Sequence, residues 1–306
     1  MTNSVATMTK LSINGVRTAV RIVVGALFVV SAAAKMGEMD RLELYIFSFG
    51  ALSLNLSFWV ARLLVAFEFL LGAALVANIH RRAVAWSGLG AIGAFSAFLV
   101  YALVAGRNDN CHCLGEMVEM TPLQSLGKNV ALAAALLFVL PQRGGLTPRR
   151  YLTLGLGIIV TVAIFVISPP DNINPHRNYN QALNSAAWNS LPKSSERRVV
   201  CFYSTSCEYC LLTSSKIASL ARRHGLEDKV EVWFADSGAD LNTQVEEFFR
   251  ATLSPTFRWQ ALDLRQFLVT TNGEMPIVLL TEGDSIAAEY NYRTVDEGAI
   301  IDFFEE

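Results

Sequence analysis

The chain has 306 residues, of which 52% are hydrophobic and 17% are charged, and its mean hydropathy is +0.36. These values are too apolar for an ordinary soluble protein, and a formal net charge of -2 favours neither a nucleic-acid partner nor an acidic substrate. The five cysteines are too few for a disulfide scaffold, and two close pairs with one cysteine left over indicate redox chemistry.

Five apolar runs in the first half of the chain predict a membrane-spanning helical part. Residues 1–16 before them are polar and unpatterned, and we expect a mobile cytoplasmic tail there. Each run is close to the roughly 20 apolar residues that cross the hydrocarbon core of a bilayer. The runs cover about residues 17–34, 56–78, 83–105, 123–140 and 151–167. Small residues at 31–34 leave open that the first run is a cleaved signal peptide.

Basic residues in the loops between these runs predict the orientation of the helices. Lysine and arginine are frequent before the first run and after the second and fourth runs, and they are fewer in the other loops. By the positive-inside rule, the N-terminus lies in the cytoplasm. Five crossings then place the C-terminal part outside, together with the loop after the third run. The expected location is the cytoplasmic (inner) membrane, whose lipid is an expected partner.

The loop after the third run carries the first cysteine pair, Cys111-His112-Cys113. A disulfide between cysteines one residue apart closes a tight ring, which is strained and easier to reduce than a relaxed bridge. This favours a redox-active disulfide between Cys111 and Cys113. Two other interpretations stay open, namely an inert disulfide that pins the loop and a copper or zinc site that uses His112. We expect no metal.

Four ionisable residues lie within or beside the apolar runs. Glu68 falls near the middle of the second run, where an ionisable group is costly and needs a partner or a proton. Arg62 and Lys35 lie nearer the outer surface, and Arg21 lies toward the inner surface. Glu68 is therefore a candidate for a quinone or proton site, and the other three are candidate quinone-binding residues. The alternative for Glu68 is a structural hydrogen bond or ion pair.

A linker and a soluble α/β domain follow the last apolar run. Residues 169–196 are rich in proline and asparagine and predict a linker, in which residues 182–191 could form a short helix. From residue 197 to residue 306 the pattern is that of a soluble α/β domain. The expected strands cover about residues 199–203, 230–235, 276–280 and 286–292, and the expected helices cover residues 210–223 and 294–304.

The second cysteine pair, Cys207-Glu208-Tyr209-Cys210, follows a predicted buried strand and opens a predicted helix. The N-terminus of a helix stabilises the thiolate of Cys207 through its N–H groups and partial positive charge. Cys210, one turn inside the helix, is shielded and would resolve a mixed disulfide. A zinc half-site is the alternative, but a second Cys-x-x-Cys or a nearby histidine pair is absent from the sequence. Cys201 lies inside the strand and is expected to be a buried core thiol.

Residues 197–306 resemble the thioredoxin family through this strand, Cys-x-x-Cys and helix pattern and through Met275-Pro276. The resemblance implies that Pro276 is a cis-proline beside the active cysteines and that its backbone holds the substrate strand. The stretch from residue 240 to residue 270 is longer than in a minimal thioredoxin and would reshape the partner surface. Glu208 is a second departure from the family pattern. A carboxylate beside Cys207 disfavours the Cys207 thiolate, which argues against a strongly oxidising disulfide.

Residues 17–140 resemble the DoxX-like superfamily and, within it, the methylamine-utilisation family MauE. The matching positions are Arg21, Gly25, Phe28, Lys35-Met36, Glu68 with Gly72, Gly106-Arg107, Cys111-His112-Cys113-Leu114-Gly115 and Lys128-Asn129. The family loop has an aromatic residue where Leu114 stands. The resemblance implies four DoxX-like helices over residues 17–141, with residues 142–168 as a loop and a fifth, linking helix. It also implies disulfide chemistry outside the membrane, with a thioredoxin-like partner that this chain carries as a fused domain.

These patterns predict a membrane-bound thiol–disulfide oxidoreductase. We expect thiols of an exported client protein to reduce Cys207–Cys210, which is then reoxidised by Cys111–Cys113. No cysteine lies in the inner loops or within an apolar run, so a membrane quinone is the natural acceptor of the electrons. The alternative is a membrane-anchored thioredoxin-like reductase or assembly chaperone, whose helices only anchor it and bind partners.

Overall fold

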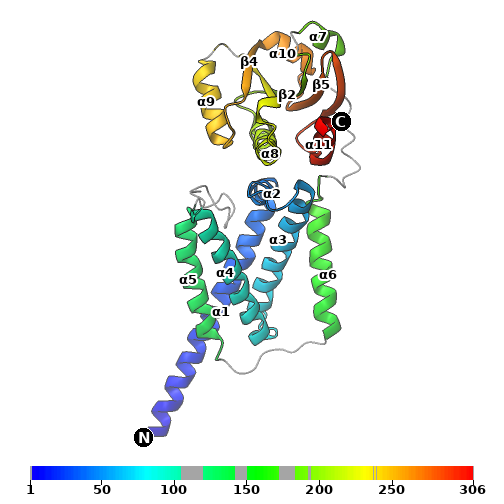
Figure 1. Ribbon diagram of the computed structural model, residues 1–306. Coiled ribbons are helices and arrows are strands. Elements are labelled where there is room, and N and C mark those ends of the chain that lie inside the picture. The colour runs from blue at the N-terminus through cyan, green and yellow to red at the C-terminus, as the bar shows by residue number, and fades with distance from the viewer. Residues whose placement is uncertain are drawn as a thin grey trace. The chain divides into compact units, whose positions relative to one another are not determined.

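The computed structural model describes residues 2–104, 120–141, 150–171, 183–191, 194–236, 238 and 240–305 (Figure 1). The chain divides into two compact units. One unit consists of Met1–Leu42 and Trp59–Pro169, and the other of Glu43–Phe58 and Pro170–Glu306. The first unit is helical, whereas the second contains a mixed sheet covered by helices. The predicted combination of a membrane helical part and a soluble α/β domain is confirmed.

Among the residues that the structure describes, four helices are long and apolar enough to cross a membrane, which marks a multi-pass membrane protein. They are α1 (Thr2–Gly37), α3 (Leu54–Val76), α4 (Arg81–Val104) and α5 (Pro122–Val139). The fifth predicted run forms α6 (Arg150–Ile167), whose described apolar stretch, Gly155–Ile167, is shorter. Helices α3 to α6 begin and end within a few residues of the predicted runs, because the apolar length dictates both ends.

Two features of the N-terminal region differ from the expectation. Helix α1 begins at Thr2, so residues 2–16, which were expected to form an unpatterned mobile tail, belong to a helix. Adding a residue to an existing helix costs much less than nucleating a new one, and the apolar part of α1 supplies the nucleus. A short helix, α2 (Met39–Phe47), was not predicted. Its nine residues include three charged ones, so the sequence of this helix does not resemble an apolar membrane-spanning segment.

Helices α1 and α3 approach each other closely at Gly25 and Gly72. A Cβ atom at Gly25 would lie 2.8 Å from the carbonyl oxygen of Gly72, and one at Gly72 would lie 2.6 Å from the carbonyl oxygen of Gly25. Side chains do not tolerate such distances, so this backbone contact requires glycine at both positions. Small residues at helix interfaces are the usual means by which membrane helices pack closely.

The second unit is built on a five-stranded sheet with the order β4-β3-β2-β5-β6 (Figure 1). Strands β2, β3 and β4 are parallel, and β5 and β6 run antiparallel to their neighbours. The strands are β2 (Arg197–Tyr203), β3 (Val230–Asp236), β4 (Arg258–Asp263), β5 (Ile277–Glu282) and β6 (Ser285–Tyr290). The helices are α7 (Ser185–Asn189), α8 (Glu208–His224), α9 (Leu241–Ala251), α10 (Leu264–Thr271) and α11 (Glu297–Glu305), with a 3-10 turn, η2, at Glu227–Lys229.

Side chains of β2 alternate between two apolar cores, one on each face of the sheet. Val199, Cys201 and Tyr203 face the first core with α8, α9 and α11, whereas Val200 and Phe202 face the second core with α7 and α10. This alternation follows from the period of two in a strand. The sheet therefore presents Cys201 and Tyr203 to the helix that begins after Cys207.

The predicted linker over residues 169–196 is shorter in the structure, because parts of it belong to the second unit. Trp188 of α7 is 2% exposed and packs 5.8 Å from the ring of Trp233 in the second core. The short helix expected within residues 182–191 is confirmed, but as a piece of the soluble domain. Asp171 is also buried, and its carboxylate pairs with Lys216 at 3.2 Å and with Arg293 at 3.0 Å.

Residues 43–58 are part of the second unit as well. Phe47, Leu54 and Phe58 are buried in its first core. The Leu54 N–H donates a hydrogen bond to Glu297 Oε2 at 2.8 Å, and the Arg223 guanidinium lies 4.6 Å from the centre of the Phe47 ring. This participation was not visible in the sequence, because it joins segments far apart along the chain.

Candidate functional site

The fold places Cys207 and Cys210 at the N-terminus of α8, as the sequence predicts. Cys207 is the N-cap residue, and its Sγ accepts a hydrogen bond of 3.2 Å from the Cys210 N–H. An N-cap side chain that accepts from the first turn satisfies one of the unpaired N–H groups of the helix. Cys207 is partly exposed, whereas Cys210 is fully buried. An incoming thiol can therefore reach Cys207 and not Cys210.

Local interactions separate the two thiols in acidity. A hydrogen bond from the Cys210 thiol, the largest effect, lowers the pKa of Cys207 from 9.0 to about 7, and the N–H groups of Cys210 and Tyr209 also lower it. Burial and the Glu208 carboxylate act against this reduction of the pKa. Burial, followed by the neighbouring Cys207, raises the pKa of Cys210 far above its ordinary value. Cys207 is thus the more acidic thiol of the pair near neutral pH, and its role as a nucleophile stays a prediction.

The peptide bond between Met275 and Pro276 is cis, which confirms the expectation for Pro276. Strand β5 begins directly after Pro276 and pairs antiparallel with β2, with Ile277 opposite Phe202. The start of β5 and the end of β2 therefore lie next to each other at the same end of these two strands. The loop that follows β2 at this end carries Cys207. The proposed role of this backbone in holding a substrate strand stays a prediction.

Tyr209, inside the Cys-x-x-Cys motif, is 49% exposed and stacks on Tyr292 at a centroid distance of 4.6 Å. The Arg293 guanidinium lies 4.3 Å from the same Tyr292 ring. The sequence analysis did not find Tyr292 or Arg293, because no motif links them to the cysteines. The buried Tyr292 ring therefore lies next to both Tyr209 and Arg293.

Cys201 is buried in β2, as expected for a core thiol, and burial raises its pKa to about 12. Cys111 and Cys113 lie outside the described residues, so their pairing and role stay predictions. In the part of the chain that the structure describes, no three His, Cys, Asp or Glu side chains lie close enough together to hold a metal ion.

Of the four candidate quinone-binding residues, the structure joins Lys35 and Glu68. Lys35 Nζ lies 2.5 Å from Glu68 Oε2 and donates a second hydrogen bond to Ser31 Oγ at 3.1 Å. Both charged side chains are nearly buried in the helical unit. The ion pair supplies the partner that an acid at this depth needs.

Arg21 and Arg62 bind main-chain carbonyl groups instead. Arg21 donates to the carbonyl groups of Leu75 and Val76 at the end of α3. Arg62 donates to Ser168 O at 2.5 Å and to Pro169 O at 2.9 Å, just after α6. The last carbonyl groups of a helix lack partners within the helix, and these arginines supply them. The structure therefore does not bring either arginine together with Lys35 and Glu68.

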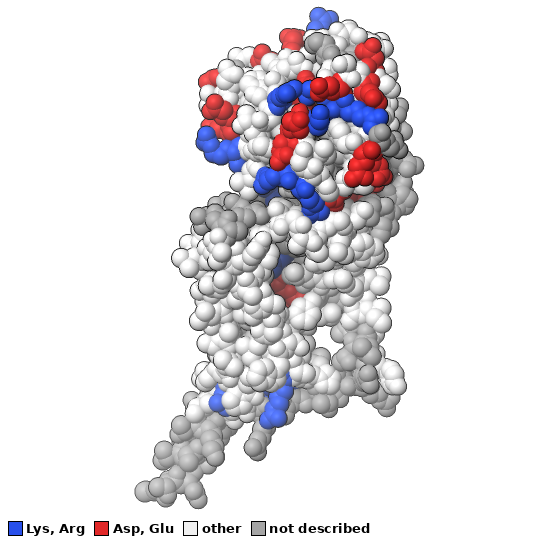
Figure 2. Space-filling model, viewed as in Figure 1, with Lys and Arg blue, Asp and Glu red and all other residues white. Residues whose placement is uncertain are grey.

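Lys128 of α5 is a further charged residue of this region that the sequence analysis did not include in the site. Its charge interacts with those of Lys35 and Glu68. Next to it, Asn129 is buried and donates a hydrogen bond to Ser96 Oγ at 3.1 Å. The signal that could have identified Lys128 was its position inside an apolar run, in the Lys128-Asn129 motif. Figure 2 shows basic and acidic atoms in a hollow of the otherwise almost uncharged helical surface.

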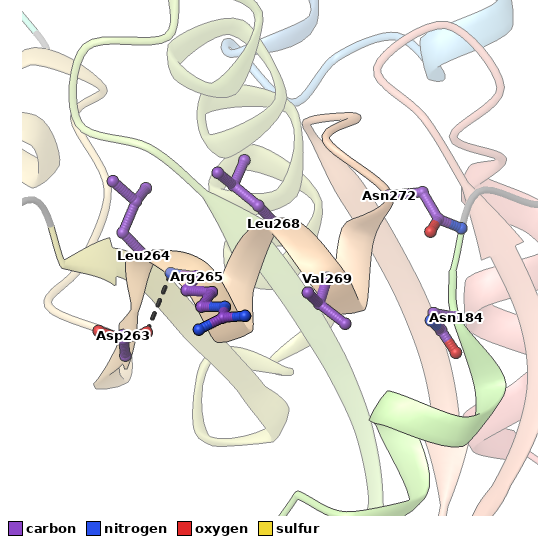
Figure 3. Close-up of a pocket in the computed structure, with 7 residues that line it drawn as sticks. All are labelled: Asn184, Asp263, Leu264, Arg265, Leu268, Val269 and Asn272. Carbon is purple, nitrogen blue, oxygen red and sulfur yellow. Dashed lines mark hydrogen bonds between the residues drawn. The ribbon is translucent and has the colours of Figure 1, made fainter.

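A surface pocket of about 650 Å³ in the second unit lies between α7 and α10 (Figure 3). Two of its polar residues cap their own helices, since Asp263 Oδ1 accepts from the Arg265 N–H at 3.0 Å and Asn184 caps α7. The lining residues are Asn184, Asp263, Leu264, Arg265, Leu268, Val269 and Asn272. None of the predicted site residues that the structure describes lines this pocket.

Comparisons with known proteins support the membrane helical part of the chain. Protein TlpB of Flavobacterium psychrophilum is 26% identical to the chain over 194 residues, which are 59% of this chain and 51% of that protein. The chain thus spans about half the length of the curated relative that it matches. Residues 13–142 match the family described as methylamine utilisation protein MauE. The expected MauE resemblance is therefore confirmed, and the helical part with its Cys111–Cys113 loop is similar to that family.

Proposed function

We propose that the protein is a membrane-bound thiol–disulfide oxidoreductase whose residues 197–306 form a thioredoxin-like domain. The observation that carries this proposal is the pair at the start of α8. Cys207 is partly exposed and has a pKa of about 7, and Cys210 is buried one turn away and retains its proton. A nucleophilic thiol beside a shielded resolving thiol is the arrangement that thiol–disulfide exchange needs.

In the proposed first reaction, the Cys207–Cys210 disulfide oxidises two thiols of an exported client protein. A client thiolate attacks Cys207 Sγ, the bond between Cys207 and Cys210 breaks, and Cys210 leaves as a thiolate that takes up a proton. A second client thiolate then attacks the client sulfur of the mixed disulfide, and Cys207 leaves. The client gains one disulfide, and the Cys207/Cys210 pair gains two electrons. The low pKa of Cys207 makes it a good leaving group in this second step.

In the proposed second reaction, Cys111–Cys113 reoxidises the pair. The Cys207 thiolate attacks the loop disulfide, and Cys210 resolves the resulting bond, so that two electrons and two protons pass to Cys111 and Cys113. A membrane quinone would accept these two electrons and two protons from the loop. The relay requires both pairs on the extracytoplasmic side, with the N-terminus inside, as the charges of the loops predict.

The residues around Glu68 fit a quinone chemically. A carboxylate can carry a proton, and the ammonium groups of Lys35 and Lys128 can donate hydrogen bonds to carbonyl oxygens. We therefore place the quinone site at Glu68, Lys35 and Lys128. In this proposal Arg21 and Arg62 hold the helix ends that frame the site, because their guanidinium groups already bind main-chain carbonyl groups.

The relay is tested by trapping its intermediate. In a chain with Cys210→Ser and Cys113→Ser, added oxidised glutathione supplies the disulfide through which Cys207 and Cys111 can become linked, and neither cysteine then has a neighbouring thiol that could resolve the bond between them. Mass spectrometry should find a cross-linked peptide pair from these two regions, which is lost on reduction. Adding Cys207→Ser should abolish the pair, whereas adding Cys201→Ser, a matched change of a buried thiol, should leave it.

If these variants give client adducts and no cross-link within the chain, the loop cysteines are structural and the relay is wrong. The alternative then stands, namely a membrane-anchored thioredoxin-like reductase or assembly chaperone. Trapping with Cys210→Ser alone identifies the client in either case. A reagent that cannot cross membranes should label reduced Cys207 from outside intact cells, and labelling only after lysis would contradict the proposed orientation.

A further inference from the structure

The end of the helical unit at which α3 and α5 end and α4 begins is basic. Arg17 and Arg21 lie one turn apart on the same side of α1, and Arg81 is the first residue of α4. Figure 2 shows basic atoms and no acidic ones at this lower end of the unit, on the face that it draws. The ends of membrane-spanning helices lie at the level of the lipid headgroups, so these side chains can meet lipid phosphates.

Arg21 and Arg81 are both anchored on the tight turn between α3 and α4. Arg21 Nη1 donates to the carbonyl oxygens of Leu75 and Val76, to the second at 3.1 Å. The Asn78 N–H donates to the same Leu75 oxygen at 3.2 Å, and Asn78 Oδ1 accepts from Arg81 Nε at 2.7 Å. One turn thus holds the two guanidinium groups near each other, and their charges interact.

Arg17 extends this basic group toward the end of α5. Its guanidinium carbon lies 5.2 Å from the centre of the Phe138 ring. Its Nε is buried and, like Nε of Arg21, has no hydrogen-bond partner among the residues that the structure describes. Arg21 is only 5% exposed, and the hydrogen bonds described for it come from Nη1. Both guanidinium groups therefore call for an acceptor that the described chain does not supply.

The sequence around these arginines contains no acid that could balance them. Residues 1–37, 69–108 and 120–170 contain neither aspartate nor glutamate. The one acid of α3, Glu68, lies two turns before the end of the helix and pairs with Lys35. Guanidinium groups stay protonated in proteins, so neighbouring ones repel each other unless an anion lies between them. This anion has to come from outside the chain.

We propose that Arg17, Arg21 and Arg81 bind the phosphate of an anionic phospholipid headgroup at this end of the helical unit. The nitrogens of a guanidinium form a fork that matches two oxygens of a phosphate, and such charged hydrogen bonds are among the strong ones. The bound lipid would join α1 to the turn between α3 and α4 and to the end of α5. This site is separate from the thiol exchange and from the quinone site proposed above.

Exposed apolar side chains beside the cations favour a lipid over a soluble anion. Val16 and Leu137, which precede Arg17 and Phe138 in the chain, are each 52% exposed. Acyl chains can cover such side chains, whereas an inorganic anion cannot. The loop charges predict that this end lies in the cytoplasmic leaflet, where anionic lipids attract basic groups. A zwitterionic lipid fits less well, because its ammonium group would bring a further cation to the site.

The test is lipid binding by the full chain in detergent, measured by native mass spectrometry and by the rise in unfolding temperature. Phosphatidylglycerol should bind and stabilise the protein, whereas phosphatidylcholine and inorganic phosphate should do so much more weakly. In Arg17→Gln the apparent Kd for phosphatidylglycerol should rise roughly tenfold, as for the loss of a hydrogen bond between charged groups. Arg82→Gln is the matched control, because it removes one charge from an exposed side chain at the same end, and it should change this Kd far less.

Arg81→Gln should weaken the binding as Arg17→Gln does, which covers the case of a poorly folded Arg17 variant. Arg17→Lys keeps the charge without the fork and should recover only part of the affinity. Equal losses in Arg17→Gln and Arg82→Gln would overturn the inference, because net charge alone would then attract the lipid. Equal binding of phosphatidylcholine would also overturn it, and equal stabilisation by inorganic phosphate would show that the ligand is a soluble anion and not a lipid.

Discussion

The helical part and the soluble domain each place two cations near one carboxylate, but they connect these charges differently. In the soluble domain Asp171 bonds to Lys216 and to Arg293 through separate oxygens, and Lys216 also donates to the Tyr292 carbonyl at 2.7 Å. Every charge there has a hydrogen-bonded partner. Such a closed network holds segments together and offers no donor to a ligand.

The corresponding group of charges in the helical part is open, in the sense that one of its two cations makes no hydrogen bond to the carboxylate. Glu68 bonds to Lys35, whereas Lys128 interacts with both charges without a hydrogen bond or ion pair of its own among the residues described. A cation at this depth is costly unless it gains a partner or lines a functional site. The comparison shows that a closed group of charges is best tested by its contribution to stability, and an open one by its contribution to activity.

The largest effect is expected from opening the closed network. Asp171→Asn leaves two cations near each other without a carboxylate, and removing one partner of a buried pair costs about 3–5 kcal/mol. Denaturant unfolding of the full chain, followed by tryptophan fluorescence, measures the loss. Asp228→Asn is the matched control, because its contact with Lys229 is 3.9 Å long and exposed, and such pairs contribute at most about 1 kcal/mol. Equal losses in the two variants would show that the network is not closed.

Replacing Lys128 tests the open group at its unpaired member. In Lys128→Met, quinone reduction by the prereduced protein should fall roughly tenfold, as for the loss of one charged hydrogen bond, with little change in the folded yield. Lys128→Arg keeps the charge and should retain more activity. A loss of yield that matches the loss of activity would assign Lys128 a structural role.

Glu68→Gln should also slow quinone reduction more than it lowers the folded yield, because the amide cannot carry the proton. The expected loss of activity is several-fold, which is smaller than the roughly 100-fold or more of a missing general acid or base, because the ammonium group of Lys35 remains at the site. The measurement is turnover per folded molecule in detergent. If activity and yield decline equally, the Lys35–Glu68 pair is structural.

The smallest effect concerns the soluble site. Glu208 raises the pKa of Cys207, so Glu208→Gln should lower this pKa slightly below about 7. The alkylation rate of Cys207 rises with pH through its pKa, and this rise should move to lower pH in the variant. An unchanged profile would remove Glu208 from the electrostatics of the site.

Much of the fold followed from local patterns in the sequence. The apolar runs predicted α1 and α3 to α6 because bilayer thickness imposes their length, and the position of Cys207 at the start of α8 followed from a strand that ends just before it. Strand β4 was missed because only Leu262 of its residues is buried, so an edge strand shows almost no alternation. Helix α7 was predicted only as a short helix within the linker, because its place in the core depends on contacts of Trp188 with distant residues.

The candidate sites divide in the same way. Cys207, Cys210 and Pro276 were identified from motifs that fix local geometry. The grouping of Lys128 with Lys35 and Glu68 and the stacking of Tyr209 on Tyr292 depend on how separate elements pack. No spacing along the chain encodes such contacts, so the sequence alone could name these residues but could not join them.

The contact between Gly25 and Gly72 limits how this protein can vary among its relatives. Glu68 lies one helical turn before Gly72 on the same side of α3, so the distance between α1 and α3 at the glycines also governs the reach of Lys35 to the acid. A side chain at either glycine would push the two helices apart and separate the ion pair. Lineages that keep the acid should therefore keep both glycines, and a lineage that accepts alanine at either position should be free to lose Glu68 as well.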